Sequence, residues 1–197
     1  MRLFIGIALP PSLSALLSRA AHTLMTPEAQ QRITWTRPEN LHLTLSFLGQ
    51  VDPSRLDEIH RSLAAIRAPR LHLQLNGAGS FPKAGILHAQ VKPSPGLLNL
   101  AEQVFQSMEG CGFPRELRPY TPHITLARSK APIRIPHRAD NPAFQQSFTA
   151  HELRLYESIT RPEGAHYEVK AAFRSFKLNK KYDFHRKSAD FQPTENQ

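Results

Sequence analysis

The sequence predicts an α+β protein made of two pseudo-equivalent lobes around a central cleft. The first observation behind this prediction is a tetrapeptide pattern, His-x-Thr-Leu, that occurs twice, at residues 42–45 and 123–126. The second is the setting of each copy, a strand-like segment with an amphipathic helical segment nearby in the sequence. No wider repeat accompanies the tetrapeptides, so the expected equivalence is one of architecture.

Composition limits the class of protein. The chain has 197 residues, 40% of them hydrophobic, which is enough for a sizeable core. Its formal net charge is +9, from 25 Lys and Arg against 16 Asp and Glu; an RNA partner is one explanation and a solvated basic surface is the other. A single cysteine, Cys111, excludes an internal disulfide and is typical of a cytoplasmic protein. No apolar stretch approaches the ~20 residues that span a bilayer, so no membrane association is expected.

The N-terminal half is expected to mix strands and helices. Residues 3–8 are a continuous apolar run typical of a buried strand, which two prolines end too early for a signal peptide. Apolar residues at helical spacing predict helices over 11–24 and 52–66. The second of these has Asp52 as its N-cap and Pro53 at its first position. Further strands are expected at 33–36, 41–47 and 71–76.

The C-terminal half follows the same logic. A third amphipathic stripe predicts a helix over 95–109, closed by two glycines. Glycine and proline content predicts loops at 77–85 and 129–142. The polar tail over 179–197 is expected to be disordered. The remaining strands are expected at 86–91, 122–128, 148–156 and 167–178.

The repeated tetrapeptide has a chemical meaning if it lies on a strand. Side chains at i and i+2 leave a strand on the same face, so His42 and Thr44 point one way and the leucines between and beside them point the other. His123 and Thr125 repeat the arrangement. Each strand then offers an imidazole for proton transfer beside a hydroxyl that can bind an anion. A lone histidine on such a strand is usually structural, but the second copy argues against that interpretation.

Longer stretches around the two copies carry a family resemblance. Residues 35–49 (Trp-Thr-Arg-Pro-Glu-Asn-Leu-His-Leu-Thr-Leu-Ser-Phe-Leu-Gly) and 118–128 (Arg-Pro-Tyr-Thr-Pro-His-Ile-Thr-Leu-Ala-Arg) are similar to the two motifs of the two-histidine phosphoesterases. The opening strand at 1–5 and the late strand at 155–158 resemble the same family. The resemblance covers nearly the whole chain and is strongest to the RNA 2′,3′-cyclic phosphodiesterases, once described as 2′-5′ RNA ligases.

The resemblance implies a bilobal fold of mainly antiparallel sheet with flanking helices, and both motifs facing the cleft. It implies metal-independent opening of a 2′,3′-cyclic phosphate to a 2′-phosphomonoester without a cofactor, a reaction that could also run in reverse as 2′-5′ RNA ligation. By position, His42 matches the general acid and His123 the general base. Thr44 and Thr125 match the phosphate-binding threonines, and Arg128 matches a basic residue that follows the second motif.

Several residues leave alternatives open. Strand alternation alone would place Arg128 on the face opposite His123, so it reaches the site only if the strand ends or twists first; otherwise it is a surface arginine. His88 stands where the resemblance leads us to expect an aromatic residue, often Trp, which puts substrate preference in question. Lys83 and Tyr120 could contact substrate, or could serve the loop and the packing. A metal site is a poor alternative because no Asp, Glu or Cys accompanies the two motif histidines at ligand spacing.

The expected organisation is a single two-lobed phosphoesterase domain over 1–178 followed by the tail. The expected partner is RNA with 2′,3′-cyclic phosphate ends, with tRNA fragments as one source, acted on by a monomer in the cytoplasm. Two alternatives remain: a phosphodiesterase of small cyclic nucleotides or ADP-ribose cyclic phosphate, and a non-catalytic RNA-end binder. The binder is disfavoured because holding a phosphate does not require two titrating groups.

Overall fold

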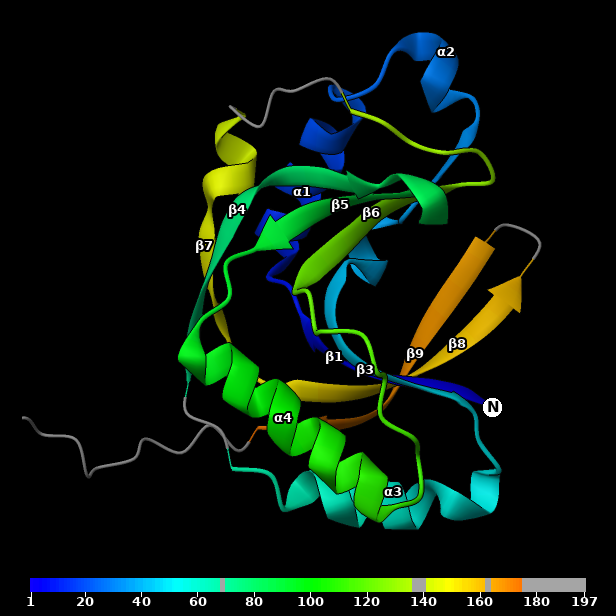
Figure 1. Ribbon diagram of the computed structural model, residues 1–197, viewed down its shortest axis with the longest axis vertical. Coiled ribbons are helices and arrows are strands. Elements are labelled where there is room, and N and C mark those ends of the chain that lie inside the picture. The colour runs from blue at the N-terminus through cyan, green and yellow to red at the C-terminus, as the bar shows by residue number, and fades with distance from the viewer. Residues whose placement is uncertain (68–69, 136–140, 162–163, 175–197) are drawn as a thin grey trace, which may run out of the picture.

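The described strands form one curled sheet. The computed structural model describes residues 1–67, 70–135, 141–161 and 164–174, and these contain a nine-stranded sheet of order β7-β4-β5-β6-β3-β1-β8-β9, with β2 paired to β6 (Figure 1). Every recorded pairing is antiparallel. The strands are β1 (Arg2–Ala8), β2 (Ile33–Trp35), β3 (His42–Gln50), β4 (Leu71–Phe81), β5 (Ile86–Val91), β6 (His123–Ser129), β7 (Ser147–Ala150), β8 (Leu153–Arg161) and β9 (Gly164–Phe173).

The sheet is divided at its centre into two lobes. The His42 lobe consists of β3, β1, β8 and β9, and the His123 lobe of β6, β5, β4 and β7 with β2 at its side. The two lobes meet where β3 and β6 share one paired position, Leu43 opposite Ile124. This arrangement confirms the prediction of an α+β fold with two pseudo-equivalent lobes of antiparallel sheet.

Helices cover the lobes in an interleaved manner. The helix α1 (Pro11–His22) contacts β6 of the His123 lobe, whereas α3 (Leu56–Ala64) and α4 (Pro95–Gly110) contact each other and the His42 lobe (Figure 1). Each lobe combines strands from before and from after the connection between β5 and α4: β1 and β3 with β8 and β9 in the His42 lobe, and β2, β4 and β5 with β6 and β7 in the His123 lobe. The short helices are α2 (Pro27–Gln30), η1 (Pro38–Asn40), η2 (Pro53–Arg55), η3 (Pro82–Ala84) and η4 (Pro142–Gln145).

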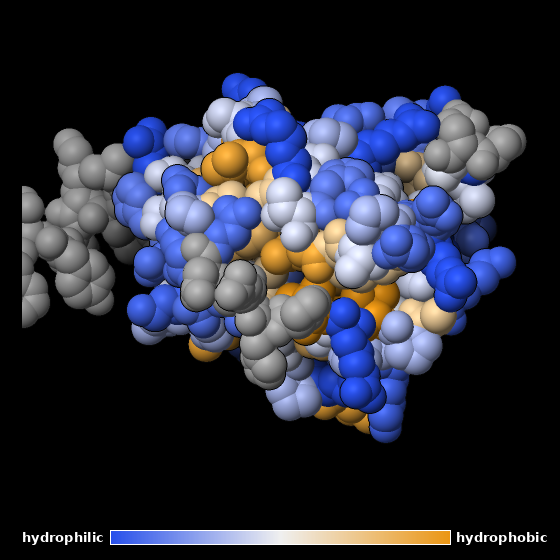
Figure 2. Space-filling view, turned by 90° about the horizontal axis from the view of Figure 1, so that it is seen from above, coloured by the Kyte–Doolittle hydropathy of each residue, from blue (hydrophilic) through white to orange (hydrophobic). Residues whose placement is uncertain are grey.

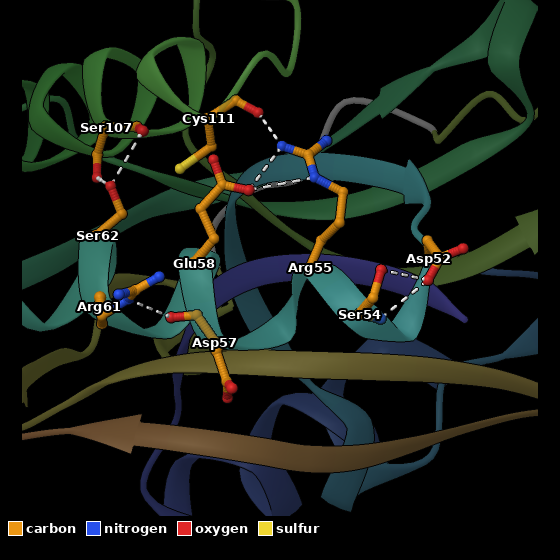
Figure 3. Close-up of polar contacts among 9 residues, drawn as sticks. All are labelled: Asp52, Ser54, Arg55, Asp57, Glu58, Arg61, Ser62, Ser107 and Cys111. Carbon is orange, nitrogen blue, oxygen red and sulfur yellow. Dashed lines mark hydrogen bonds and ion pairs between the residues drawn. The ribbon is translucent and has the colours of Figure 1, made fainter.

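Polar side chains define where α3 begins and hold α3 against α4 (Figure 3). The Asp52 carboxylate accepts a hydrogen bond from the Ser54 backbone N–H at 2.9 Å, which caps the turn that leads into α3, as the N-cap prediction required. The guanidinium of Arg55 donates to the carbonyl of Cys111, the residue that follows α4. The hydroxyls of Ser62 and Ser107, 2.9 Å apart, join the two helices further along.

The apolar side of the sheet is packed under these helices. Leu43 and Ile124 at the junction are fully buried, as are Leu63 of α3 and Leu97 of α4. The face shown in Figure 2 is mostly hydrophilic, and its apolar residues gather mainly near the middle. No helix among the described residues is long and apolar enough to cross a membrane.

Three sequence predictions need correction. The single strand expected over 148–156 is two strands, β7 and β8, which lie in different lobes because the chain crosses between them at residues 151–152. The loop expected over 77–85 is in its first half a continuation of β4, since Gly79 is the residue opposite His88 and leaves the space that this ring occupies. The helix α2 lies in a segment for which no element was expected.

The last predicted strand begins earlier than expected, at Gly164, and the described part ends with Phe173. The proposed tail over 179–197 lies outside the described residues.

Candidate active site

The two motif strands bring the four predicted side chains to the junction of the lobes. The antiparallel pairing of Leu43 with Ile124 sets the tetrapeptides head to tail across the junction. Since both of these apolar residues are fully buried in the core, alternation turns His42 and Thr44 on β3 and their counterparts on β6 to the other side of the sheet. All four are partly exposed, as groups that meet a substrate must be.

Each motif histidine is held in the same way. The Nδ1 of His42 lies 2.7 Å from the carbonyl oxygen of Asn40, and the Nδ1 of His123 lies 2.7 Å from the carbonyl oxygen of Thr121. A carbonyl oxygen can only accept, so Nδ1 carries the proton in the neutral ring and Nε2 is left with a lone pair. Both imidazoles are therefore set with Nε2 as the atom that can exchange a proton.

The carbonyl that holds His42 is itself anchored. The side-chain amide of Asn40, a buried residue, donates to the carbonyl of Ala165 on β9 at 2.8 Å. Asn40 and Thr121 were not among the predicted site residues. The signal that could have found them is their common position, two residues before each histidine.

Thr44 contacts both its own histidine and the other motif. Its hydroxyl lies 3.0 Å from the Nε2 of His42, so it donates to the ring when the ring is neutral. Its carbonyl accepts a hydrogen bond of 2.9 Å from the hydroxyl of Tyr120. Tyr120 is therefore engaged with the backbone of the first motif, although it lies just before the second.

Aromatic rings enclose both imidazoles. His42 lies 4.7 Å from Phe4 and 5.3 Å from Tyr167, measured between ring centroids. His123 lies 5.1 Å from Phe81 and 5.4 Å from His88, in both cases edge to face. Strand neighbours thus restrict each imidazole on more than one side.

Burial makes both histidines weaker bases than usual. Loss of hydration is the main cause that lowers the pKa of His42 from 6.5 to about 4; the Asn40 carbonyl opposes this shift, and the charges of Arg128 and of a protonated His123 add to it. The pKa of His123 is lowered by the same loss of hydration and by Arg128, against the Thr121 carbonyl. Both rings are therefore neutral at pH 7 in the absence of a bound anion, and a bound phosphate would favour their protonation.

Arg128 returns to the site face through a β-bulge. In the pairing of β5 with β6, His88 is opposite Thr125 and Leu87 is opposite Ala127, so Leu126 is an extra residue. Leu126 and Ala127 are consequently buried in succession, and Arg128 recovers the face of Thr125. Its exposed guanidinium is close enough to lower the pKa of both motif histidines. The strand neither ends before Arg128 nor needs a twist, because the bulge alone shifts this residue to the face of Thr125.

The other residues whose roles the sequence left undecided lie beneath the site or at the surface. His88 is only 2% exposed and stacks on Phe81 at 4.2 Å, so it lies beneath the site and does not face a substrate. Lys83 is exposed in η3. Within the described residues no group of three or more His, Cys, Asp or Glu side chains could hold a metal ion.

Comparison with known proteins gives the family. The model of the family described as LigT like Phosphoesterase matches residues 7–88 and 90–167, which include both histidine motifs. The chain belongs to the LigT-like phosphoesterase family. The predicted resemblance to this group is confirmed.

Characterised relatives and a solved structure agree with this assignment. The RNA 2′,3′-cyclic phosphodiesterase of Escherichia coli (strain K12) is 31% identical over 159 residues, which are 80% of this chain and 86% of that protein. The enzyme of the same name from Geobacillus stearothermophilus is 32% identical over 148 residues, 71% of this chain but only 47% of its relative. The crystal structure of E. coli LigT complexed with 3′-AMP superposes with a TM-score of 0.78 at 26% identity, covering 87% of this chain and 96% of that one.

Proposed function

We propose that this LigT-like phosphoesterase opens the 2′,3′-cyclic phosphate at an RNA end to a 2′-phosphomonoester, with His42 and His123 as the acid–base pair. The observation that carries the proposal is the matched geometry of the two imidazoles, each with Nδ1 on a backbone carbonyl, which leaves Nε2 as the atom that exchanges a proton. The names of the relatives from E. coli and G. stearothermophilus support the substrate class.

The reaction needs one neutral and one protonated histidine. Neutral His123 takes a proton from water, and the water oxygen forms a bond to phosphorus. The bond from phosphorus to the ribose 3′-oxygen breaks, and protonated His42 gives its proton to that oxygen. The phosphate remains on the 2′-oxygen, and the proton lost by water replaces the one lost by His42 after exchange with solvent.

An anionic substrate would favour the protonated form of His42 that the reaction needs. His42 is neutral at pH 7 because burial and the nearby charge of Arg128 depress its pKa. A phosphodiester bound between the histidines places a negative charge beside the ring and raises that pKa again. Thr44, Thr125 and Arg128 are proposed to hold the non-bridging oxygens, with Arg128 balancing the charge that develops in the transition state.

The proposal extends to organisation and reversibility. Residues 1–178 are proposed to act as one two-lobed domain, since each histidine belongs to a different lobe and both lobes are needed for the pair. The same groups could join a 2′-phosphate end to a 5′-hydroxyl end, because the acid and the base exchange roles in reverse. In water, hydrolysis is expected to dominate unless the ends are held together.

The deciding experiment uses a defined RNA that ends in a 2′,3′-cyclic phosphate. We expect a 2′-phosphomonoester as the product, in the presence of excess chelator. A product with a 3′-phosphate would reverse the assignment of the leaving oxygen, and activity that requires added zinc or manganese would refute the mechanism. Faster turnover of cyclic mononucleotides or ADP-ribose cyclic phosphate would identify the small-molecule alternative, and binding without turnover would identify an RNA-end binder.

A further inference from the structure

The two histidines lie on different lobes, and the direct pairing between their strands is slight. The strands β3 and β6 share one paired position, Leu43 with Ile124, before they diverge. Acid–base catalysis by two groups on one phosphate requires a fixed separation between them. One backbone pair is a weak local constraint on the angle between the strands, so a second tie beside it helps to define that separation.

Tyr120 provides such a tie. It lies on the segment that leads into β6, three residues before His123, yet its hydroxyl donates to the carbonyl of Thr44 in β3 at 2.9 Å. Its ring also meets Phe105 of α4 edge to face at 6.0 Å, and α4 contacts β3 of the His42 lobe as well as β4 of the His123 lobe. A side chain from the segment before the second motif is thus inserted into the lobe that carries the first.

The contacts on either side of Tyr120 continue to both imidazoles. On one side, the residue that receives its hydrogen bond, Thr44, places its own hydroxyl 3.0 Å from the Nε2 of His42. On the other side, the residue next to Tyr120 in the chain, Thr121, accepts the Nδ1–H of His123 at 2.7 Å. His42 and His123 are therefore joined by a continuous path of hydrogen bonds and one peptide unit, and Tyr120 is its central member.

We propose that Tyr120 is a positioning residue that sets the separation of His42 and His123. It does not face the reacting phosphate, because its hydroxyl is committed to a backbone carbonyl. Its effect on the reaction passes through the backbone of Thr44 and Thr121. The inference rests on the proposed two-histidine function and adds the element that makes the two lobes act as one site.

The test is Tyr120→Phe, which keeps the ring against Phe105 and removes only the hydroxyl. Since a displacement of about 1 Å can cost 10²-fold in rate, we expect kcat on an RNA cyclic phosphate to fall by about 10-fold to 100-fold, with KM changed less than about two-fold. The matched control is Ser62→Ala, which removes a hydroxyl contact between α3 and α4 within one lobe and should leave kcat unchanged. Thermal unfolding of both variants shows whether each is folded at the assay temperature.

A second substrate separates positioning from general damage. An activated aryl phosphodiester releases a phenolate, which departs without a proton. Its turnover needs only His123, so Tyr120→Phe should spare it. Equal losses on both substrates, no loss on RNA, or failure of the variant to fold would each overturn the positioning role. Wild-type turnover of RNA is measured alongside, and its absence would count against the proposed function and not against the tie between the lobes.

Discussion

His88 gives the stability of this protein a specific dependence on pH. The ring is 2% exposed, and its Nδ1 has no hydrogen-bond partner among the described residues. Burial, with a smaller contribution from the charge of a protonated His123, lowers the pKa of His88 from 6.5 to about 4. Because the folded-state pKa lies below the unfolded value, the unfolded chain binds the proton more readily. Stability is therefore full above pH 6.5 and decreases as the pH falls toward 4.

The size of the effect follows from those two pKa values. One pKa unit is worth about 1.4 kcal/mol, so lowering the pKa of His88 from 6.5 to about 4 costs about 3 kcal/mol once the pH is below both values. Integrated only from pH 7 to pH 5, the loss from His88 alone is about 2 kcal/mol in the unfolding free energy. This is a large part of the ~5–15 kcal/mol that stabilises a typical domain.

The assay is urea unfolding followed by circular dichroism at pH 7 and at pH 5. His88→Phe keeps an aromatic ring on Phe81 and cannot be protonated, so it should lose about 2 kcal/mol less than the wild-type protein between the two pH values. His42, whose pKa is also lowered to about 4, is present in both proteins and cancels in the comparison. The control His72→Phe removes a histidine exposed on β4 and should keep the wild-type pH dependence. An unchanged pH dependence in His88→Phe would refute the reasoning.

Other predictions concern the reaction itself. His42→Ala and His123→Ala should each lower kcat by about 10²- to 10⁴-fold, and the double variant should be little worse than either, because the pair acts as a unit; near wild-type rates in either would refute the pair. The pH profile of kcat/KM should be bell-shaped with its optimum below pH 6.5, since burial lowers the pKa of both histidines, and the two apparent values should be assigned to the pair; an optimum above pH 8 would contradict this. With a leaving group that needs no proton, His42→Ala should recover most of its activity and His123→Ala should not, and the opposite pattern would exchange their roles. RNA binding should weaken with salt more than binding of a cyclic mononucleotide, because a chain of net charge +9 should attract the phosphates of a longer backbone; equal salt slopes would exclude such contacts.

The parts of the fold that follow from local patterns were accessible from the sequence. Helical spacing and the Asp52 cap predicted the segment that becomes η2 and α3, and alternation placed His42 and Thr44 on one face of a strand. The helix and the strand face both depend on residues that are close together in the sequence, within one or two helical turns or strand repeats.

The parts that depend on distant partners were not accessible. The bulge at Leu126, which returns Arg128 to the site, arises from the register between β5 and β6 and leaves no pattern in either strand alone. The split of 148–156 into β7 and β8 reflects the two lobes to which these strands pair, a property of the whole chain. The Tyr120 contact with Thr44 joins positions 76 residues apart and could only be proposed once the lobes were seen together.

The interleaving of the lobes has a practical consequence. The connection between β5 and α4, at Lys92–Ser94, lies between the two histidines in the chain, and Lys92 and Pro93 are exposed. A cut there would give one fragment with β1 to β5 and His42, and another with β6 to β9 and His123. Neither fragment would contain a complete lobe or both histidines. Each fragment alone should be catalytically inactive, and turnover should appear only when the two fragments reassemble. Fused to a pair of interacting proteins, the halves would form a split enzyme whose phosphodiesterase signal reports that interaction.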